Sequence, residues 1–134
     1  MIGGDVLPPI NLALTHSERR AAAEVSRCNG KQAERDLVDL LGRADATTSA
    51  LTDPETGERL YLVTMTPYTG YPAEEDAAIL AHEAVHVSVG FLDDIGELEP
   101  GEEMTAYTVQ AVTRSLVGCH FKWKRKMLKK EGRE

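Results

Sequence analysis

Residues 79–88 contain the best-defined motif of this chain, Ile79-Leu80-Ala81-His82-Glu83-Ala84-Val85-His86-Val87-Ser88. The pattern is H-E-x-x-H. Two histidines four residues apart lie on one face of a helix, so both imidazoles can reach one metal ion. Glu83, next to the first histidine, can take a proton from a water bound to that ion. The motif therefore predicts a zinc site with His82 and His86 as ligands and Glu83 as the general base.

The residues around the motif favour a functional reason for its polar side chains. Glu83 is the only charged residue from Ala77 to Val89, which predicts a helix that is buried nearly all round. Imidazoles and a carboxylate are costly in such a helix unless something pairs with them. A metal ion would satisfy both histidines. The alternative is two core histidines that make local hydrogen bonds.

A catalytic zinc ion needs a third protein ligand from another element. Glu103 is the first candidate, because the sixteen residues between it and His86 allow the chain to turn and return as a second helix. The alternative is that Glu103 simply favours the start of that helix as an exposed acid. Other candidate ligands, in order of preference, are Glu102, Glu99, Asp94 and Asp93.

The second helix also supplies candidates for other roles. Glu103, Ala106, Tyr107 and Gln110 share one helix face through their i, i+3, i+4 and i+7 spacing. We expect Tyr107 to be catalytic, as the hydrogen-bond donor to the oxyanion, and Gln110 to orient a metal ligand. The tyrosines of the loop before the motif helix are the alternative donors, namely Tyr68 and Tyr71.

These two elements resemble a known family. H-E-x-x-H followed by a glutamate on a later helix is similar to the gluzincin branch of zinc metallopeptidases. The stretch Glu103-Met104-Thr105-Ala106-Tyr107-Thr108-Val109-Gln110 also looks like the E-x-x-A-Y-x-x-Q segment of small HExxH proteins found in phages and prophages. The resemblance covers about residues 79–110. It implies a zincin-like metallopeptidase domain that binds one Zn²⁺ per chain and acts on a peptide or protein.

Length and composition set further limits. The chain has 134 residues, of which 42% are hydrophobic, as expected for a single domain over residues 1–134. A net charge of −7 argues against nucleic acid as a partner. Two distant cysteines predict free thiols in a reducing compartment. Since neither a secretory signal nor a membrane span is recognisable, we expect a cytoplasmic protein with no membrane partner, its oligomeric state left open.

The charge is unevenly distributed, which leaves two other functions open. Residues 122–134 form a basic C-terminal tail with seven Lys/Arg and two Glu, a net of +5, so the remaining residues sum to −12. This tail, which contains Trp123, suggests a nucleic-acid-associated factor, although a solvated helix end, or a partner for the acidic remainder of the chain, explains it as well. A further alternative is a non-catalytic structural or interaction protein stabilised by zinc.

The expected fold is α+β, mostly helical, with a β-hairpin beside the HExxH helix. Residues 1–14 are expected to be an extended lead-in, followed by helices over residues 16–28 and 31–42. Thr15 and Glu18 match a capping box at the first helix. Two strands over residues 46–52 and 59–66 should form the hairpin. The motif helix should run from Pro72 to near Gly90, and the last helix from Glu102 past Val117, with Gly118 as a candidate break.

Overall fold

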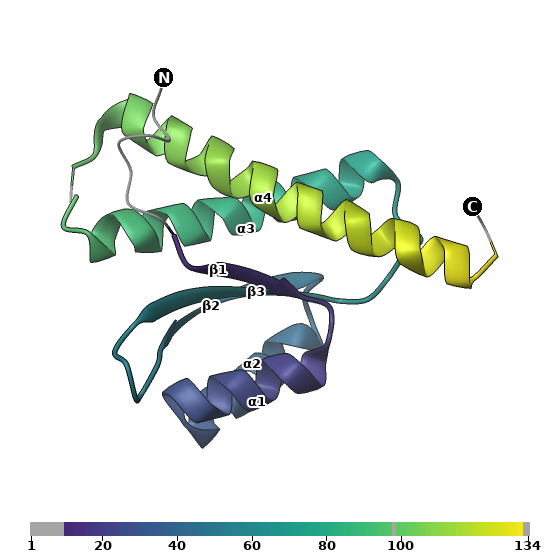
Figure 1. Ribbon diagram of the computed structural model, residues 1–134, viewed down its shortest axis with the longest axis horizontal. Helices are drawn as coiled ribbons and strands as arrows, with labels where there is room; N and C mark the ends of the chain where they lie inside the picture. Colours follow the sequence, from purple (N-terminus) through teal and green to yellow (C-terminus); the bar gives the residue numbers. More distant parts are fainter. Residues whose placement is uncertain (1–9, 98, 133–134) are drawn as a thin grey trace. The chain divides into compact units, whose positions relative to one another are not determined.

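The computed structural model describes residues 10–97 and 99–132 (Figure 1). Within these residues the chain forms three strands and four helices, and this confirms the mostly helical α+β class. Their bounds are β1 Leu12–Thr15, α1 Glu18–Asn29, α2 Lys31–Leu41, β2 Ala46–Thr52, β3 Arg59–Met65, α3 Ala73–Asp94 and α4 Gly101–Lys130. Contacts divide the described chain into two compact units, residues 10–67 and residues 68–132.

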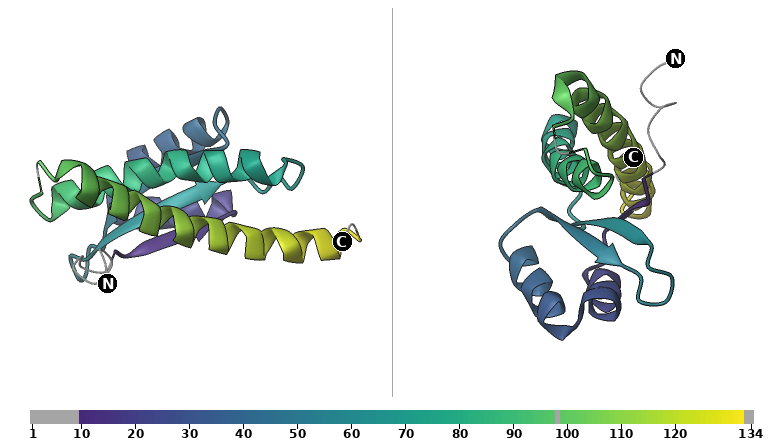
Figure 2. Two further views of the ribbon diagram at one scale, coloured as in Figure 1. Left: turned by 90° about the horizontal axis from the view of Figure 1, so that it is seen from above. Right: turned by 90° about the vertical axis from the view of Figure 1, so that its left-hand side faces the viewer.

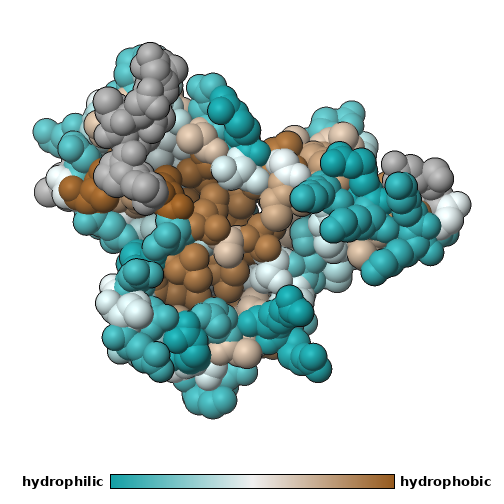
Figure 3. Space-filling view, viewed as in Figure 1, coloured by the Kyte–Doolittle hydropathy of each residue, from teal (hydrophilic) through white to brown (hydrophobic). Residues whose placement is uncertain are grey.

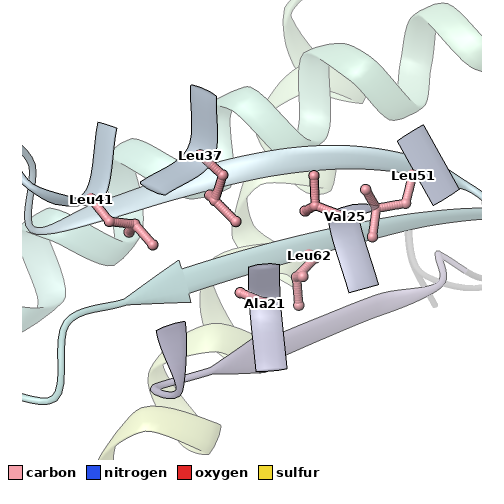
Figure 4. Close-up of a cluster of buried hydrophobic side chains, with 6 residues drawn as sticks. All are labelled: Ala21, Val25, Leu37, Leu41, Leu51 and Leu62. Carbon is pink, nitrogen blue, oxygen red and sulfur yellow. The ribbon is translucent and has the colours of Figure 1, made fainter. Parts of the chain in front are cut away.

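The unit of residues 10–67 is a three-stranded sheet covered by two helices. The strand order is β1-β3-β2, with β1 parallel to β3 and β2 antiparallel to it. Both helices lie on the same face of the sheet (Figure 2). Their apolar stripes meet the sheet in one core cluster (Figure 4), made of Ala21, Val25, Leu37, Leu41, Leu51 and Leu62.

The predicted hairpin is confirmed, and its bounds are met within one residue. The reversal between β2 and β3 is held by Asp53, whose backbone N–H donates to Glu58 O at 2.8 Å and whose backbone O accepts from Gly57 N at 2.8 Å. Gly57 adopts a positive φ of 76°, which glycine reaches without steric cost. The Pro/Gly-containing polar segment therefore forms a tight turn, as its sequence indicates.

The N-terminal part of this unit differs from the prediction. Residues 1–9 of the expected lead-in lie outside the described residues, and residues 12–15 form β1, a strand that the sequence did not reveal. The predicted cap at Thr15 is wrong because Thr15 belongs to that strand, paired with Thr64. Ser17 is the actual N-cap of α1, and its hydroxyl accepts from Arg20 N at 3.1 Å.

The unit of residues 68–132 is a helical hairpin. Helices α3 and α4 lie side by side in opposite directions (Figures 1 and 2). Proline precedes the first residue of α3, and Glu74, Glu75 and Asp76 fill its first turn, where acids complement the helix dipole. Helix α3 continues past Gly90 to Asp94, and α4 passes through Gly118 without a break.

No helix in the described part of the chain is both long enough and apolar enough to cross a membrane.

Candidate metal centre

The two histidines of the motif are paired on the exposed side of α3. Their Nε2 atoms lie 3.2 Å apart, and their rings meet edge-to-face with centroids 4.9 Å apart. A tetrahedral zinc ion with Zn–N bonds of 2.0–2.1 Å would separate two imidazole nitrogens by about 3.3 Å. His82 and His86 therefore fit two ligand positions of one zinc ion.

The expectation that α3 is buried nearly all round is wrong. Its buried residues follow one stripe, which includes Asp76, Leu80, Ala84, Val87 and Phe91. On the other side the two histidines, Val85 and Val89 are exposed. The low number of charged residues in residues 77–89 is therefore not explained by core packing alone, and the two histidines are not core residues.

Glu83 lies away from the exposed histidine face. Glu83 is only 5% exposed, whereas His82 and His86 are both exposed. Successive residues of a helix point about 100° apart, so Glu83 falls at the edge of the buried stripe of α3. A role as general base would require this carboxylate to turn toward the histidine pair.

The structure does not bring the predicted third ligand to the histidines. Within residues 10–97 and 99–132 there is no group of three or more His, Cys, Asp or Glu side chains placed to hold a metal ion. This applies to Glu103 and equally to the other candidates, namely Glu102, Glu99, Asp94 and Asp93.

The register of the two helices explains why Glu103 is remote. Asp76 contacts His120 and Lys124, so in an antiparallel pair His86 lies near the level of residue 112. Glu103 is nine residues before that level, which is about 13 Å along the axis of α4 at 1.5 Å per residue.

The candidate oxyanion donors are also spread out. Tyr107 is 43% exposed on α4, and Gln110 is exposed on the same helix. Tyr68 is exposed and Tyr71 half-buried, and their rings meet edge-to-face with centroids 4.8 Å apart. Tyr107 shares a face with Glu103, as its spacing predicts, but the histidine pair is not part of that arrangement.

A second polar cluster, which the sequence did not reveal, lies inside the helical hairpin. Asp76 and His120 are completely buried and Lys124 is 8% exposed. Lys124 Nζ donates to Asp76 Oδ2 at 2.6 Å and to Tyr71 O at 2.7 Å, and His120 Nε2 lies 3.1 Å from Asp76 Oδ2. Among the described residues, Asp76 Oδ1 has no hydrogen-bond partner.

The sequence signals for this cluster are ordinary ones. Asp76 is one of three acids in a helix start, and Lys124 is one of several cations in the tail. The one sequence signal for the cluster is the i, i+4 spacing of His120 and Lys124, which places both residues on the same face of a helix. The cluster is shielded from solvent, and its bond between Lys124 and Asp76 joins α3 to α4.

Both cysteines are free, in agreement with the prediction that they form no disulfide. Cys28 is a half-buried residue of α1, and this burial raises the pKa of its thiol. Cys119 is exposed on α4. Neither thiol lies in a group that could hold a metal ion in the described part of the chain.

Comparisons with known proteins add no relative: no protein-family model, no curated protein and no solved structure matches the chain. The resemblance to gluzincins therefore rests on the two motifs in residues 79–110.

Proposed function

We propose that this chain is a zinc-dependent hydrolase, and more specifically a metallopeptidase. His82 and His86 would hold its metal ion. The observation that supports this proposal is the 3.2 Å separation of the two Nε2 atoms on an exposed helix face. A peptide or protein is the proposed substrate, because zinc with one open position suits attack of water on an amide carbonyl. The cytoplasm is the proposed location.

The proposal assigns a role to each residue of the site. When bound, zinc lowers the pKa of a coordinated water and polarises the substrate carbonyl. His82 and His86 supply neutral nitrogen ligands. Glu83 accepts the proton of the water, which requires its buried carboxylate to turn toward the histidines. Glu103 completes the ligand set and Tyr107 donates to the oxyanion, and both roles require the first turns of α4 to approach His86.

A second candidate function is a non-catalytic, zinc-stabilised interaction protein. The observations that favour it are the burial of Glu83 and the remoteness of Glu103 from the histidine pair. Two exposed imidazoles could then hold a metal ion that a binding partner also ligates. In this case zinc would be bound, but Glu83 would not be needed for its function.

Metal content tests both functions. We expect about one zinc per chain in the wild type, measured by elemental mass spectrometry after dialysis, because His82 and His86 together with the proposed ligand Glu103 would supply the three protein ligands of a catalytic zinc site. His82→Ala and His86→Ala should each abolish binding, whereas the control His16→Ala, far from the motif in sequence, should leave it intact. Glu103→Ala should weaken binding if Glu103 is the third ligand.

Peptide hydrolysis separates the two functions. Under the hydrolase proposal Glu83→Gln retains zinc and loses about 100-fold or more of the turnover, as expected for loss of a general base. Zinc binding without any turnover in the wild type would favour the interaction protein. A wild-type chain that is folded but binds no zinc would refute both.

A further inference from the structure

The C-terminal end of α4 presents an exposed basic surface. Five exposed cations lie there, and we refer to them as the α4 basic face: Lys122, Arg125, Lys126, Lys129 and Lys130. In the part of the chain that the structure describes, none of these five side chains makes a hydrogen bond or an ion pair. Figure 3 shows hydrophilic residues over this end of α4, which is yellow in Figure 1.

The buried cluster determines which way this face points. Lys124 is directed inward by its bonds to Asp76 and Tyr71 O. Residues two positions away on a helix point about 160° away from it, so Lys122 and Lys126 must point to the opposite side. Trp123 stacks on the buried His120 ring with centroids 5.6 Å apart. The basic face is therefore held in a fixed orientation on a continuous helix.

Ordinary helix electrostatics do not account for all of these cations. Lys129 and Lys130 lie in the last turn, where positive charge complements the helix dipole. The other three lie further from the end, beyond the reach of that effect. Within α4 itself no acid balances them, because the helix has no Asp or Glu after Glu103. A surface with this unbalanced charge is complementary to a polyanion.

We propose that the α4 basic face binds the phosphate backbone of double-stranded DNA. Residues 122–130 span about 12 Å of helix. Duplex DNA presents one negative charge per about 1.7 Å of its axis, so this length faces about seven phosphate charges. Five cations on one rigid helix can contact several of them. Contacts to phosphates alone make the binding independent of sequence.

An anionic membrane fits the same face less well. A helix that binds at a membrane surface inserts an exposed apolar side, rich in Trp, Phe or Leu. Here the apolar residues of this segment are half-buried, namely Phe121, Trp123, Met127 and Leu128. The exposed large apolar residues of the described chain all lie outside residues 121–130. This binding function does not depend on the metal site.

The net charge of the chain limits the strength of the interaction. At −7, the protein as a whole is repelled by DNA. This repulsion is screened beyond about 10 Å at 0.1 M salt, whereas the basic face contacts the phosphates directly. We therefore expect weak binding that depends steeply on salt.

Fluorescence anisotropy with a labelled DNA duplex of about two helical turns, titrated with the full chain over a range of KCl, tests the proposal. Three to five phosphate contacts predict a slope of log affinity against log salt of about −2.7 to −4.5. The variant Lys122→Gln/Lys126→Gln/Lys129→Gln should bind about tenfold or more weakly, and the slope should be shallower by about 2 to 3.

A matched control separates local from overall charge. Arg19→Gln/Arg20→Gln/Arg114→Gln removes the same charge from exposed positions outside the basic face. It should retain affinity within about threefold, since the removed charges make no phosphate contact. Circular dichroism must show that both variants keep the wild-type helix content. Equal losses in the two variants, or no binding of the wild type at about 20 mM KCl, would refute the proposal.

Binding to vesicles of phosphatidylglycerol and phosphatidylcholine tests the alternative partner, an anionic membrane surface. Binding of the chain to these vesicles without binding to the duplex would also overturn the proposal, in favour of a membrane surface. Duplex binding that the triple Lys→Gln variant loses would support it.

Discussion

At the scale of single residues, the polar cluster of Asp76, His120 and Lys124 has the largest energetic consequence. Removal of one partner from a buried ion pair destabilises the fold strongly, because the other charge is left desolvated without its counter-ion. The 2.6 Å bond from Lys124 Nζ to Asp76 Oδ2 joins residues 48 positions apart in the sequence. This bond connects the first turn of α3 to the C-terminal part of α4.

Removing the buried carboxylate should therefore be costly. We expect Asp76→Asn to lower the free energy of unfolding by about 3–5 kcal/mol, since Lys124 would remain as a buried charge without its counter-ion. Urea unfolding followed by circular dichroism measures this. The control Glu75→Gln, at the exposed neighbouring position, should change stability by less than about 0.5 kcal/mol.

The double variant Asp76→Leu/Lys124→Met tests whether the loss of stability comes from the unpaired charge of Lys124. Replacement of both charges by apolar residues should recover much of the lost stability. If Asp76→Asn behaved like Glu75→Gln, the cluster would not be holding the two helices together.

At the scale of elements, the β2–β3 hairpin shows how a local turn defines its strands. Asp53 Oδ1 accepts hydrogen bonds from Glu55 N at 2.8 Å and Thr56 N at 3.2 Å. These two bonds, with a smaller contribution from Arg27, lower the pKa of Asp53. They favour the ionised carboxylate and preset the reversal, so the register of the hairpin follows from the turn.

This lowered pKa predicts a pH dependence of stability. Because the folded pKa lies below the unfolded value of about 3.9, ionised Asp53 stabilises the fold above that pH. Asp53→Ala should therefore be less stable than the wild type at pH 7. The difference should vanish as the pH falls through the folded pKa.

Thermal unfolding of both proteins at a series of pH values between about 2 and 7 measures this difference. Glu55→Ala, in the same turn, serves as the control and should show no comparable pH-dependent difference. A gap between wild type and Asp53→Ala that stayed constant down to the lowest pH would disprove the role of the ionised carboxylate.

At the scale of the whole molecule, the chain builds two compact units, each with its own buried residues. The unit of residues 10–67 has its apolar cluster between the sheet and helices α1 and α2, with Leu51 fully buried. In the other unit, Leu80 and Leu116 are among the fully buried residues of α3 and α4. A chain of this size has little apolar area to spare, so single core residues matter.

Truncation of a core leucine should show this directly. We expect Leu51→Ala to reduce the free energy of unfolding by about 2–5 kcal/mol through lost burial and the cavity left behind. Leu40→Ala is the control, because Leu40 is 47% exposed. Its effect should stay within about 1 kcal/mol in the same urea unfolding assay. Similar losses in the two variants would show that the cluster is not the core.

Local features were predictable from the sequence alone. Helix α2, the hairpin strands and the turn at Asp53 follow from hydrophobic periodicity, glycine positions and turn chemistry within a few residues. The pairing of His82 with His86 is equally local, since the helical repeat places residues four apart on one face. The exposure of this pair was not predictable, because an uncharged segment can be buried or can face solvent.

Contacts between distant residues were decided only by the tertiary structure. Strand β1 exists because it pairs with β3, nearly fifty residues later in the sequence. No local sequence pattern indicates that partner. The burial of Asp76 with Lys124 and the distance between Glu103 and the histidines both depend on the register of α3 against α4. The sequence by itself determined the four helices, the two hairpin strands and the paired imidazoles. Their surroundings depend on the simultaneous packing of many side chains, which the spacing of residues along the chain does not encode.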